Sequence, residues 1–366
     1  MLTVELLPAG YGDAILVTYG PADGESHRIL IDGGQARSFP AVADRLRSFK
    51  GPIDLLVVTH VDTDHIGGAV RLLASKALPA RFKGIWFNGF VHLGAARGML
   101  GPIHGERLTA LIVKSDLPWN EGWPWPDGVP DGVPAGIGGP VVVGDELPVI
   151  DLPGGATATV LSPTPTKLVK LLPVWEAVVE KAGLRPDVKA TEDDEIPLVA
   201  PGLLGGVSLE DLAGLHTDDD AAEANGSSIA FVFEFEGVRV LFGADAHADA
   251  LVAGLTTLAG PDGKVHLDAC KLPHHGSKGN CTRALVDLID CPLWMISTNG
   301  RRFHHPDDEA LARVVRGRTD PPPKLVWNYR SDRFKAFTKE YPPDTSGYTV
   351  VVPDEGAEGI TVRLGD

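Results

Sequence analysis

Runs of apolar residues that end in histidine and aspartate recur along this chain and restrict what it can fold into. The run 55–58 is typical of a buried strand, and the segment 60–65 that follows it reads HVDTDH. Four potential metal ligands therefore lie close together: His60, Asp62, Asp64 and His65. Like charges held so close repel, and their burial is costly, unless a cation lies between them. We interpret the segment as a metal-binding loop rather than as a solvated acidic turn.

Three later apolar runs, at 238–242, 270–273 and 295–300, end in the same way. The residues that follow them include Asp245, the pair His274 and His275, and the pair His304 and His305. Ligands at the ends of several strands, brought together by the fold, are the usual way in which a scaffold builds a site. Four such clusters in one chain predict a single metal centre.

Strands and helices alternate along the chain, which indicates an α/β or α+β protein. We expect strands near 28–32, 54–58, 84–87, 147–150, 156–161, 229–235, 238–242, 268–272, 292–297, 324–327, 347–352 and 359–364. We expect helices near 41–49, 67–75, 105–115, 167–182, 248–259, 282–289 and 307–316. With 366 residues, of which 43% are hydrophobic, the chain can bury a large core.

Composition argues against several classes of protein. No segment approaches the roughly 18 apolar residues of a membrane span, and no signal peptide is evident. The three cysteines are odd in number and form no Cys-x-x-Cys pair, which favours a cytoplasmic protein without disulfides. The net charge of −16 disfavours indiscriminate binding to nucleic acid. Local positive charge near the motifs is restricted to Lys271, Lys278, Arg301 and Arg302, which are equally explained as surface residues.

Several segments resemble the metallo-β-lactamase fold, and within that superfamily the soluble domain of ComEC-type DNA-uptake proteins. The superfamily's first motif is usually His-x-His-x-Asp-His, and here Asp62 stands in place of the second His, as is typical of the ComEC-like branch. The other matching segments are LLPAGYGDAILV (6–17), ILIDGG (29–34), NGSSI (225–229), FGAD (242–245), PHHGS (273–277) and HP (305–306).

This resemblance covers about residues 1–90 and 221–315. It implies an αββα sandwich with the site at one edge, between the two sheets. We expect residues 1–366 to form a single domain of this kind, with a variable and irregular middle region at about 92–224.

The resemblance also implies a ligand set for two divalent metal ions, Zn²⁺, Mn²⁺ or both. His60 and Asp62 would hold the first ion, Asp64 and His65 the second, and Asp245 would bridge them. One histidine of the pair His274 and His275 would complete the second position; the sequence cannot order the pair, and we favour His275 slightly. Asp32 is expected to buttress the metal loop from a neighbouring strand end.

One departure from the superfamily pattern concerns the first metal. A further His normally follows a strand in the middle of the chain, but the corresponding stretch 159–164 has none. His92, His104 and His216 are interpreted as surface or structural residues. Fewer imidazoles and more oxygens favour Mn²⁺ or Mg²⁺ in the first position, while Zn²⁺ suits the second.

Two metal ions about 4 Å apart bridge a water and lower its pKa enough for hydroxide to attack a phosphodiester, ester, thioester or lactam. The candidate catalytic residues are Asp64 and His305, with His305 as proton donor or phosphate contact, or alternatively as a loop cap. Four residues are candidates for substrate binding, although turn chemistry also explains the first three: Asn225, Ser227, Ser228 and His304.

The middle region carries two unusual segments. The first, 118–144, contains Trp119, Trp123 and Trp125, which either form a substrate-facing flap or pin a long loop to the body; we favour the second. The second, 187–223, is acidic and Gly-rich, and we expect a mobile, solvated loop there.

The predicted function is that of a dinuclear hydrolase, a phosphodiesterase or nuclease by resemblance to the ComEC-like branch. Its partner is then a phosphodiester substrate; nucleic acid is possible but is not indicated by the charge. One alternative is a hydrolase of a small lactone, thioester or lactam. Another is a non-catalytic binding scaffold, against which the retained metal-ligand residues argue.

Overall fold

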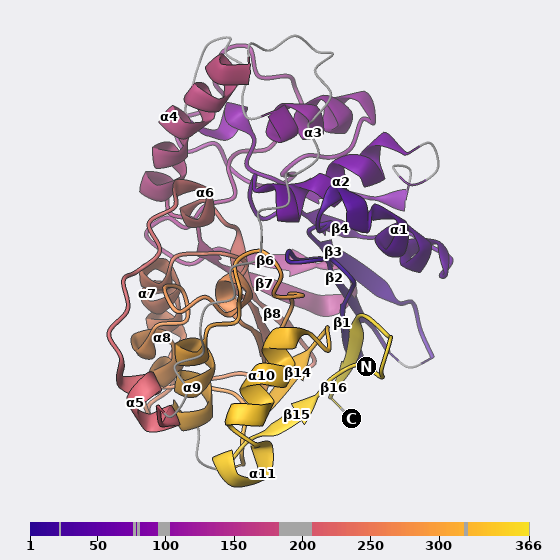
Figure 1. Cartoon of the computed structure of the whole chain (residues 1–366). Helices are drawn as coiled ribbons and strands as arrows, with labels where there is room; N and C mark the ends of the chain where they lie inside the picture. Colours follow the sequence, from indigo (N-terminus) through magenta and orange to yellow (C-terminus); the bar gives the residue numbers. More distant parts are fainter. Residues whose placement is uncertain are drawn as a thin grey trace.

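Two β-sheets lie face to face, with helices on both outer surfaces (Figure 1). The computed structural model describes residues 1–21, 23–75, 78, 81–93, 103–182, 207–317 and 321–365. The arrangement confirms the predicted αββα sandwich.

Within these residues, the first sheet has six strands in the order β16-β1-β2-β3-β4-β5. Their bounds are Leu2–Leu6 (β1), Ile15–Tyr19 (β2), His27–Ile31 (β3), Leu55–Val57 (β4), Ile85–Trp86 (β5) and Ile360–Leu364 (β16). The second sheet has eight described strands in the order β15-β14-β13-β11-β9-β8-β7-β6. Their bounds are Val149–Leu152 (β6), Ala156–Ser162 (β7), Ala230–Phe235 (β8), Val238–Phe242 (β9), Ala269–Lys271 (β11), Leu293–Ile296 (β13), Lys324–Trp327 (β14) and Thr349–Val351 (β15).

The α-helices complete the outer layers. Their bounds are Phe39–Arg47 (α1), Thr63–Ala74 (α2), Ile103–Lys114 (α3), Pro165–Ala182 (α4), Leu209–Gly214 (α5), Glu223–Gly226 (α6), Ala248–Leu258 (α7), Arg283–Leu288 (α8), Asp308–Gly317 (α9), Asp332–Glu340 (α10) and Pro343–Ser346 (α11). None of the helices in the described part of the chain combines the length and apolar character that crossing a membrane requires.

Strand side chains alternate between two kinds of core, as the two-residue period of a strand dictates. In β3, Ile29 and Ile31 point into the core between the sheets, whereas Leu30 packs under the helices that cover the first sheet. In β8, Phe231 lies between the sheets and Val232 under the helices of the second sheet. Burial on both faces explains why these strands read as continuous apolar runs.

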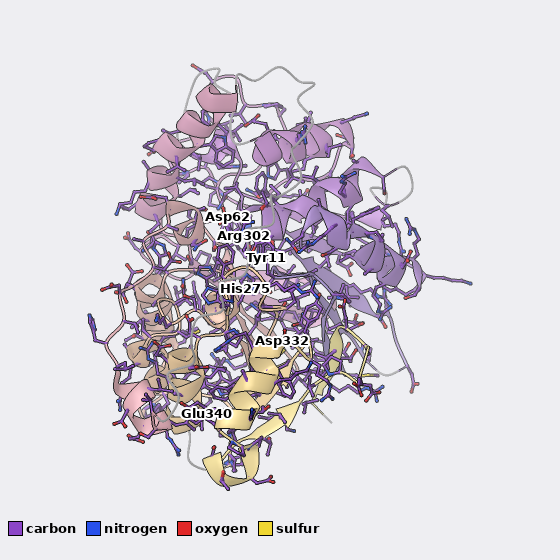
Figure 2. All side chains as sticks on the ribbon, in the orientation of Figure 1. Tyr11, Asp62, His275, Arg302, Asp332 and Glu340 are labelled. Atoms are coloured by element: carbon purple, nitrogen blue, oxygen red, sulfur yellow. The ribbon has the colours of Figure 1, made fainter. Side chains whose placement is uncertain are left out.

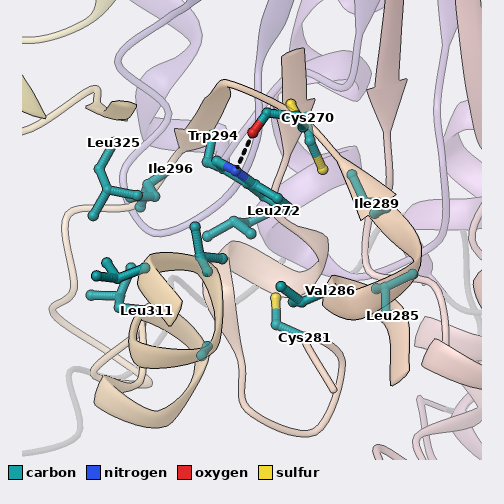
Figure 3. Close-up of a cluster of buried hydrophobic side chains, with 14 of the residues drawn as sticks. Cys270, Leu272, Cys281, Leu285, Val286, Ile289, Trp294, Ile296, Leu311 and Leu325 are labelled. Carbon is teal, nitrogen blue, oxygen red and sulfur yellow. Dashed lines mark hydrogen bonds between the residues drawn. The ribbon is translucent and has the colours of Figure 1, made fainter. Parts of the chain in front are cut away.

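The core under α7 to α10 contains the cysteines (Figure 3). Cys270, Cys281 and Cys291 are all buried and free of disulfide bonds. Burial raises the pKa of the Cys281 thiol to about 12, and Cys291 accepts a hydrogen bond from Trp294 through its carbonyl oxygen. The cysteines are therefore core residues.

The Trp-rich segment is an irregular loop that is pinned to the body. Trp119 and Trp123 are buried, and the Trp119 ring stacks against Phe87. Trp125 is half-buried and stacks on His92. Anchoring, rather than a substrate-facing flap, is therefore the structural role of these rings. The acidic run 192–195 lies outside the described residues.

The structure differs from the expected elements in two places that matter later. Helix α2 begins at Thr63, inside the metal-binding segment, and not near residue 67. The early start is possible because Gly68 lets the helix approach the segment after β3: a Cβ at Gly68 would lie 1.8 Å from Gly33 O. Helix α10, which the sequence analysis missed, is capped by Ser331, whose Oγ accepts from Phe334 N.

Candidate metal centre

The predicted ligands come together at the ends of strands from both sheets. The segment 60–65 follows β4 in the first sheet, while Asp245 and the His274–His275 pair follow the parallel neighbours β9 and β11 in the second. Several turns here hold non-glycine residues at positive φ: Ala244 at 46°, His274 at 44° and His275 at 54°. Such residues are uncommon and cluster at functional sites.

The carboxylate of Asp245 is the centre of the cluster. Four imidazole Nε2 atoms lie within 4.0 Å of its Oδ2, at the distances 3.3 Å (His65), 3.6 Å (His275), 3.7 Å (His274) and 4.0 Å (His60). Two ligands held tetrahedrally about 2.1 Å from one ion lie about 3.4 Å apart. The spacing therefore suits atoms that share metal ions.

Asp64 and Asp62 lie on opposite sides of this centre. Asp64 Oδ2 is 3.7 Å from His275 Nε2 and 4.0 Å from His65 Nε2. Asp62 Oδ2 is 3.7 Å from His60 Nε2, and its side chain is 46% exposed, so this side of the centre is open to solvent. Three buried ligand groups result: His60–His65–Asp245, Asp64–His65–His275 and Asp13–Asp245–His275.

The imidazole atoms that face the centre lack partners. Nε2 of His60, His65 and His275 and Oδ1 of Asp245 are buried without a hydrogen bond in the described part of the chain. A buried polar atom left unpaired costs about 1–3 kcal/mol. Converging orphaned nitrogen and carboxylate atoms fit a divalent cation, which would satisfy them together.

The Nδ1 atoms of His65 and His60, on the side of each ring away from the centre, are held by Asp32, directly and through Thr59 respectively. Asp32 Oδ2 lies 2.8 Å from His65 Nδ1 and accepts a hydrogen bond from Thr59 Oγ1 at 2.8 Å. Thr59 Oγ1 in turn lies 3.0 Å from His60 Nδ1. Such outer contacts orient metal-binding imidazoles. Asp32 thus buttresses the loop, as the sequence suggested, but sequence reasoning missed Thr59.

His274 and His275 are held differently. His275 Nδ1 donates to Ser297 O at 2.8 Å. His274 Nδ1 lies 2.9 Å from Asn280 Oδ1 and 3.2 Å from Asp220 Oδ2. Only His275 belongs to a three-residue ligand group with Asp64 and His65, so the geometry favours His275 over His274 for that position.

Residues 7–168 match the family model of the metallo-beta-lactamase superfamily. The match covers 162 of the 366 residues, so it marks just under half of the chain as similar to this superfamily. Domains of this superfamily are typical of metallo-hydrolases, in agreement with the ligand groups above.

Two solved structures are also similar to this chain. A mutant of the CmlA beta-hydroxylase is 13% identical, with a TM-score of 0.39; the match covers 99% of this chain and 54% of that one, so this chain spans about half of its length. Zn²⁺-bound PqqB from Methylobacterium extorquens is 10% identical, with a TM-score of 0.37 and full coverage of both chains. No curated protein matches this sequence.

The described histidines of the middle region, His92 and His216, do not join the ligand groups. His92 is buried, accepts from Gly89 N and stacks on Trp125, and burial lowers its pKa to about 4. His216 is exposed, and the side chain of His104 lies outside the described residues. Among the described residues, the first metal position therefore gains no His from the middle of the chain.

The candidate substrate-binding residues differ in their contacts and in their burial. Asn225 Nδ2 lies 3.4 Å from His274 Nδ1 and donates to Asp220 Oδ2 at 2.7 Å, so it belongs to the centre's surroundings. Ser227 donates to Ala224 O within a turn, which is the turn chemistry considered as its alternative. Ser228 is fully buried, and His304 is half-buried at a φ of 59°.

Three aromatic rings, which we call the ring wall, are in contact from the exposed Phe303 through His305 to His274 at the centre. The rings of Phe303 and His305 stack at 6.1 Å, and the His305 ring lies 5.2 Å from that of His274. Phe303 is 48% exposed. Arg302 Nη1 donates to Tyr11 Oη at 2.6 Å, and both residues are labelled in the middle of the molecule in Figure 2. Arg302 therefore supplies positive charge near the ring wall.

Two of the expected basic residues point elsewhere. Lys278 pairs with Glu309 at 2.9 Å near the surface. Lys271 is fully buried and pairs with Asp13 at 2.7 Å. Neither interaction directs the ammonium group to a substrate.

Protons compete with metal for the two imidazoles of the second group. Burial alone lowers the pKa of His275, but the carboxylates of Asp245 and Asp13 outweigh it and raise that pKa to about 9. For His65, burial again lowers the pKa, but the carboxylates of Asp245 and Asp32 outweigh it and raise that pKa well above its usual value. Both shifts favour the imidazolium form of these rings in the metal-free protein at pH 7.

We expect metal binding at pH 7 to release one to about two protons, because a bound imidazole must be neutral. Isothermal titration calorimetry in buffers with different ionisation enthalpies measures this number. It should fall when the titration is repeated near pH 9.5. Binding without proton release at pH 7 would contradict the assignment of His65 and His275 as ligands.

Proposed function

We propose that this chain is a dinuclear metal-dependent hydrolase that cleaves phosphodiester bonds. The supporting observation is that Asp245 Oδ2 lies within 4.0 Å of four imidazole Nε2 atoms. A carboxylate has two oxygens and can bridge two cations, which is how paired hydrolytic metals are held.

In this proposal, His60 and Asp62 hold the first ion, Asp64, His65 and His275 hold the second, and Asp245 bridges them. His274 presents Nε2 to the same carboxylate, which suits a contact to the first ion or to the substrate. The oxygen-rich first position favours Mn²⁺, and the second, with two imidazoles, favours Zn²⁺.

Bound divalent ions supply Lewis-acid polarisation and an activated water. The protein's part is to position the ions, the attacking water and the substrate. Asp64 would hold the second ion, and its pKa is lowered: burial opposes this shift, and His275 and His65 outweigh it. Asp64 is therefore ionised at neutral pH and can orient the attacking water.

His305 is suited to contact a phosphate oxygen. Burial lowers its pKa, against the opposing effect of Asp307, so the ring is neutral at pH 7. A neutral imidazole offers one N–H donor, and donors aimed at developing negative charge stabilise the transition state. This favours the phosphate contact over the proton donor among the two roles expected for His305.

The choice of a phosphodiester rests on two observations. The motif segments resemble the ComEC-like branch, including Asp62 in place of a histidine. Arg302 and His305 add donors for an anionic group beside the centre. The reacting groups of lactones, thioesters and lactams carry no such negative charge, whereas the phosphodiester group is itself an anion.

The test is to purify the protein, measure its metal content by mass spectrometry, and assay it with Mn²⁺ or Zn²⁺. We expect hydrolysis of bis(p-nitrophenyl) phosphate and little turnover of a lactone, thioester or cephalosporin substrate. Turnover of the lactone, thioester or cephalosporin alone would replace the phosphodiesterase with a small-molecule hydrolase. Failure to take up either metal would leave a binding scaffold.

We expect His305→Gln to lower kcat for bis(p-nitrophenyl) phosphate by about 100-fold, the typical cost of losing one oxyanion donor. Metal content should stay unchanged. His247→Gln is the matched control, because His247 contacts Ala222 O and Lys167 instead of the centre. Equal effects of the two substitutions would argue against a phosphate contact by His305.

A further inference from the structure

A fully buried ion pair lies behind the metal centre. Lys271 Nζ donates to Asp13 Oδ2 at 2.7 Å and to Leu272 O at 3.0 Å. The side chains are 0% and 1% exposed. A buried ion pair is weak evidence for stability, because apolar residues of similar volume often serve as well. Its presence therefore calls for another explanation.

The pair joins the two sheets directly beneath the histidine turn. Asp13 lies just before β2 in the first sheet, and Lys271 is the last residue of β11 in the second. The chain continues from Lys271 into the turn that carries His275. A second link runs beside it, since Ser297 Oγ donates to Gly12 O at 3.2 Å.

The free oxygen of Asp13 faces a metal-binding imidazole. Asp13 Oδ1 lies 3.4 Å from His275 Nδ1 and has no hydrogen-bond partner among the described residues. His275 Nδ1 already donates to Ser297 O. Two oxygens thus surround Nδ1, while Nε2 on the far side of the ring points to Asp64 and Asp245 at 3.7 and 3.6 Å.

We propose that the Asp13–Lys271 pair is a positioning device that keeps the proton of His275 on Nδ1 and aims an unprotonated Nε2 at the second metal position. Asp13 supplies the carboxylate, and Lys271 holds that carboxylate in place and balances its charge in the interior. A carboxylate behind a metal-binding imidazole fixes its tautomer and raises its basicity. The inference rests on the proposed metal centre.

The test uses the double variant Asp13→Asn/Lys271→Met, which removes both charges and leaves neither one buried alone. We expect the affinity for one of the two ions to fall by about 10- to 100-fold, and the affinity for the other to stay unchanged. Isothermal titration with Mn²⁺ and Zn²⁺ measures both constants. The visible spectrum of the Co²⁺-loaded protein should change as well, because it reports on the ligands of the ion.

The chain offers a matched control at the opposite end of β4. Lys83 Nζ donates to Asp54 Oδ1, also at 2.7 Å, and the Asp54 side chain is 3% exposed. Asp54 precedes β4, whereas the metal-binding segment follows it. Asp54→Asn/Lys83→Met should leave both metal affinities and the Co²⁺ spectrum unchanged.

The outcomes separate this inference from the proposed function. Unchanged affinities and an unchanged Co²⁺ spectrum in the Asp13→Asn/Lys271→Met protein would overturn the positioning role while leaving the metal centre intact. A wild-type protein that binds no ion would overturn both. If the double variant does not fold, Asp13→Asn alone serves, since an unpaired buried lysine can lose its proton; the same selective loss is expected.

Discussion

Asp245→Asn is expected to empty both metal positions. The substitution keeps the size of the side chain but removes the charge that faces four imidazoles. The affinity for each ion should fall by more than about 100-fold, which is the upper end for residues that only orient a ligand. Hydrolysis should be lost with the ions. Mass spectrometry of the purified protein, together with an assay on bis(p-nitrophenyl) phosphate, measures both effects.

Asp62→Asn provides the contrast. Its carboxylate lies 3.7 Å from His60 Nε2, and Asp62 belongs to none of the three buried ligand groups. We expect this variant to lose only the first ion and to keep one ion per chain. Loss of a single ion in both variants would show that Asp245 does not bridge, and the dinuclear proposal would then fail.

Lys271→Met is expected to destabilise the fold by about 3–5 kcal/mol, because it removes the ammonium group 2.7 Å from the buried Asp13 carboxylate and leaves the more distant His275 ring, at 3.4 Å, as its cationic partner. Adding Asp13→Asn should restore most of this loss. Urea unfolding of the metal-free proteins at pH 7 gives the free energies of unfolding. If the single and double variants were equally unstable, packing rather than charge would explain the effect.

The pH dependence has a definite sign. Burial raises the pKa of Asp13, but Lys271 and His275 outweigh it and hold that pKa below its usual value in the wild type. The ionised Asp13 carboxylate therefore stabilises the wild-type fold above its pKa in the unfolded chain, near 4, and this stabilisation is lost as pH falls below that value. Without Lys271, the buried Asp13 carboxylate keeps His275 but loses its nearest cation, so its pKa rises and protonation relieves the variant. The difference in free energy of unfolding between Lys271→Met and the wild type should therefore become smaller as pH falls from 7 toward 4.

The local part of the site could be predicted from sequence because strand ends and motif spacing are local properties. The segment 60–65, Asp245 and the pair at 274–275 each follow an apolar run, and the fold brings them together. The superfamily match covers residues 7–168 alone, so the prediction of the ligands in the second sheet depended on the pattern of strand ends and on the resembling segments 242–245 and 273–277.

The parts that sequence could not predict depend on distant partners. Lys271 reads as a charged residue in an apolar run, and nothing local identifies Asp13 as its partner 258 positions away. Asn280 and Asp220, which hold His274, carry no motif of their own. The start of α2 depends on contacts with the segment after β3, and α10 has a mostly polar sequence.

The division of the ligands between the two sheets also sets an order of events during synthesis. His60 and His275 are 215 residues apart. At about 5–20 residues per second, a ribosome needs on the order of tens of seconds to cover that distance. During this time the nascent chain displays the segment 60–65 without Asp245 or His275. The complete centre can form only after β11 has paired with β9, so we expect tight metal uptake to come late and to report on the joining of the two halves.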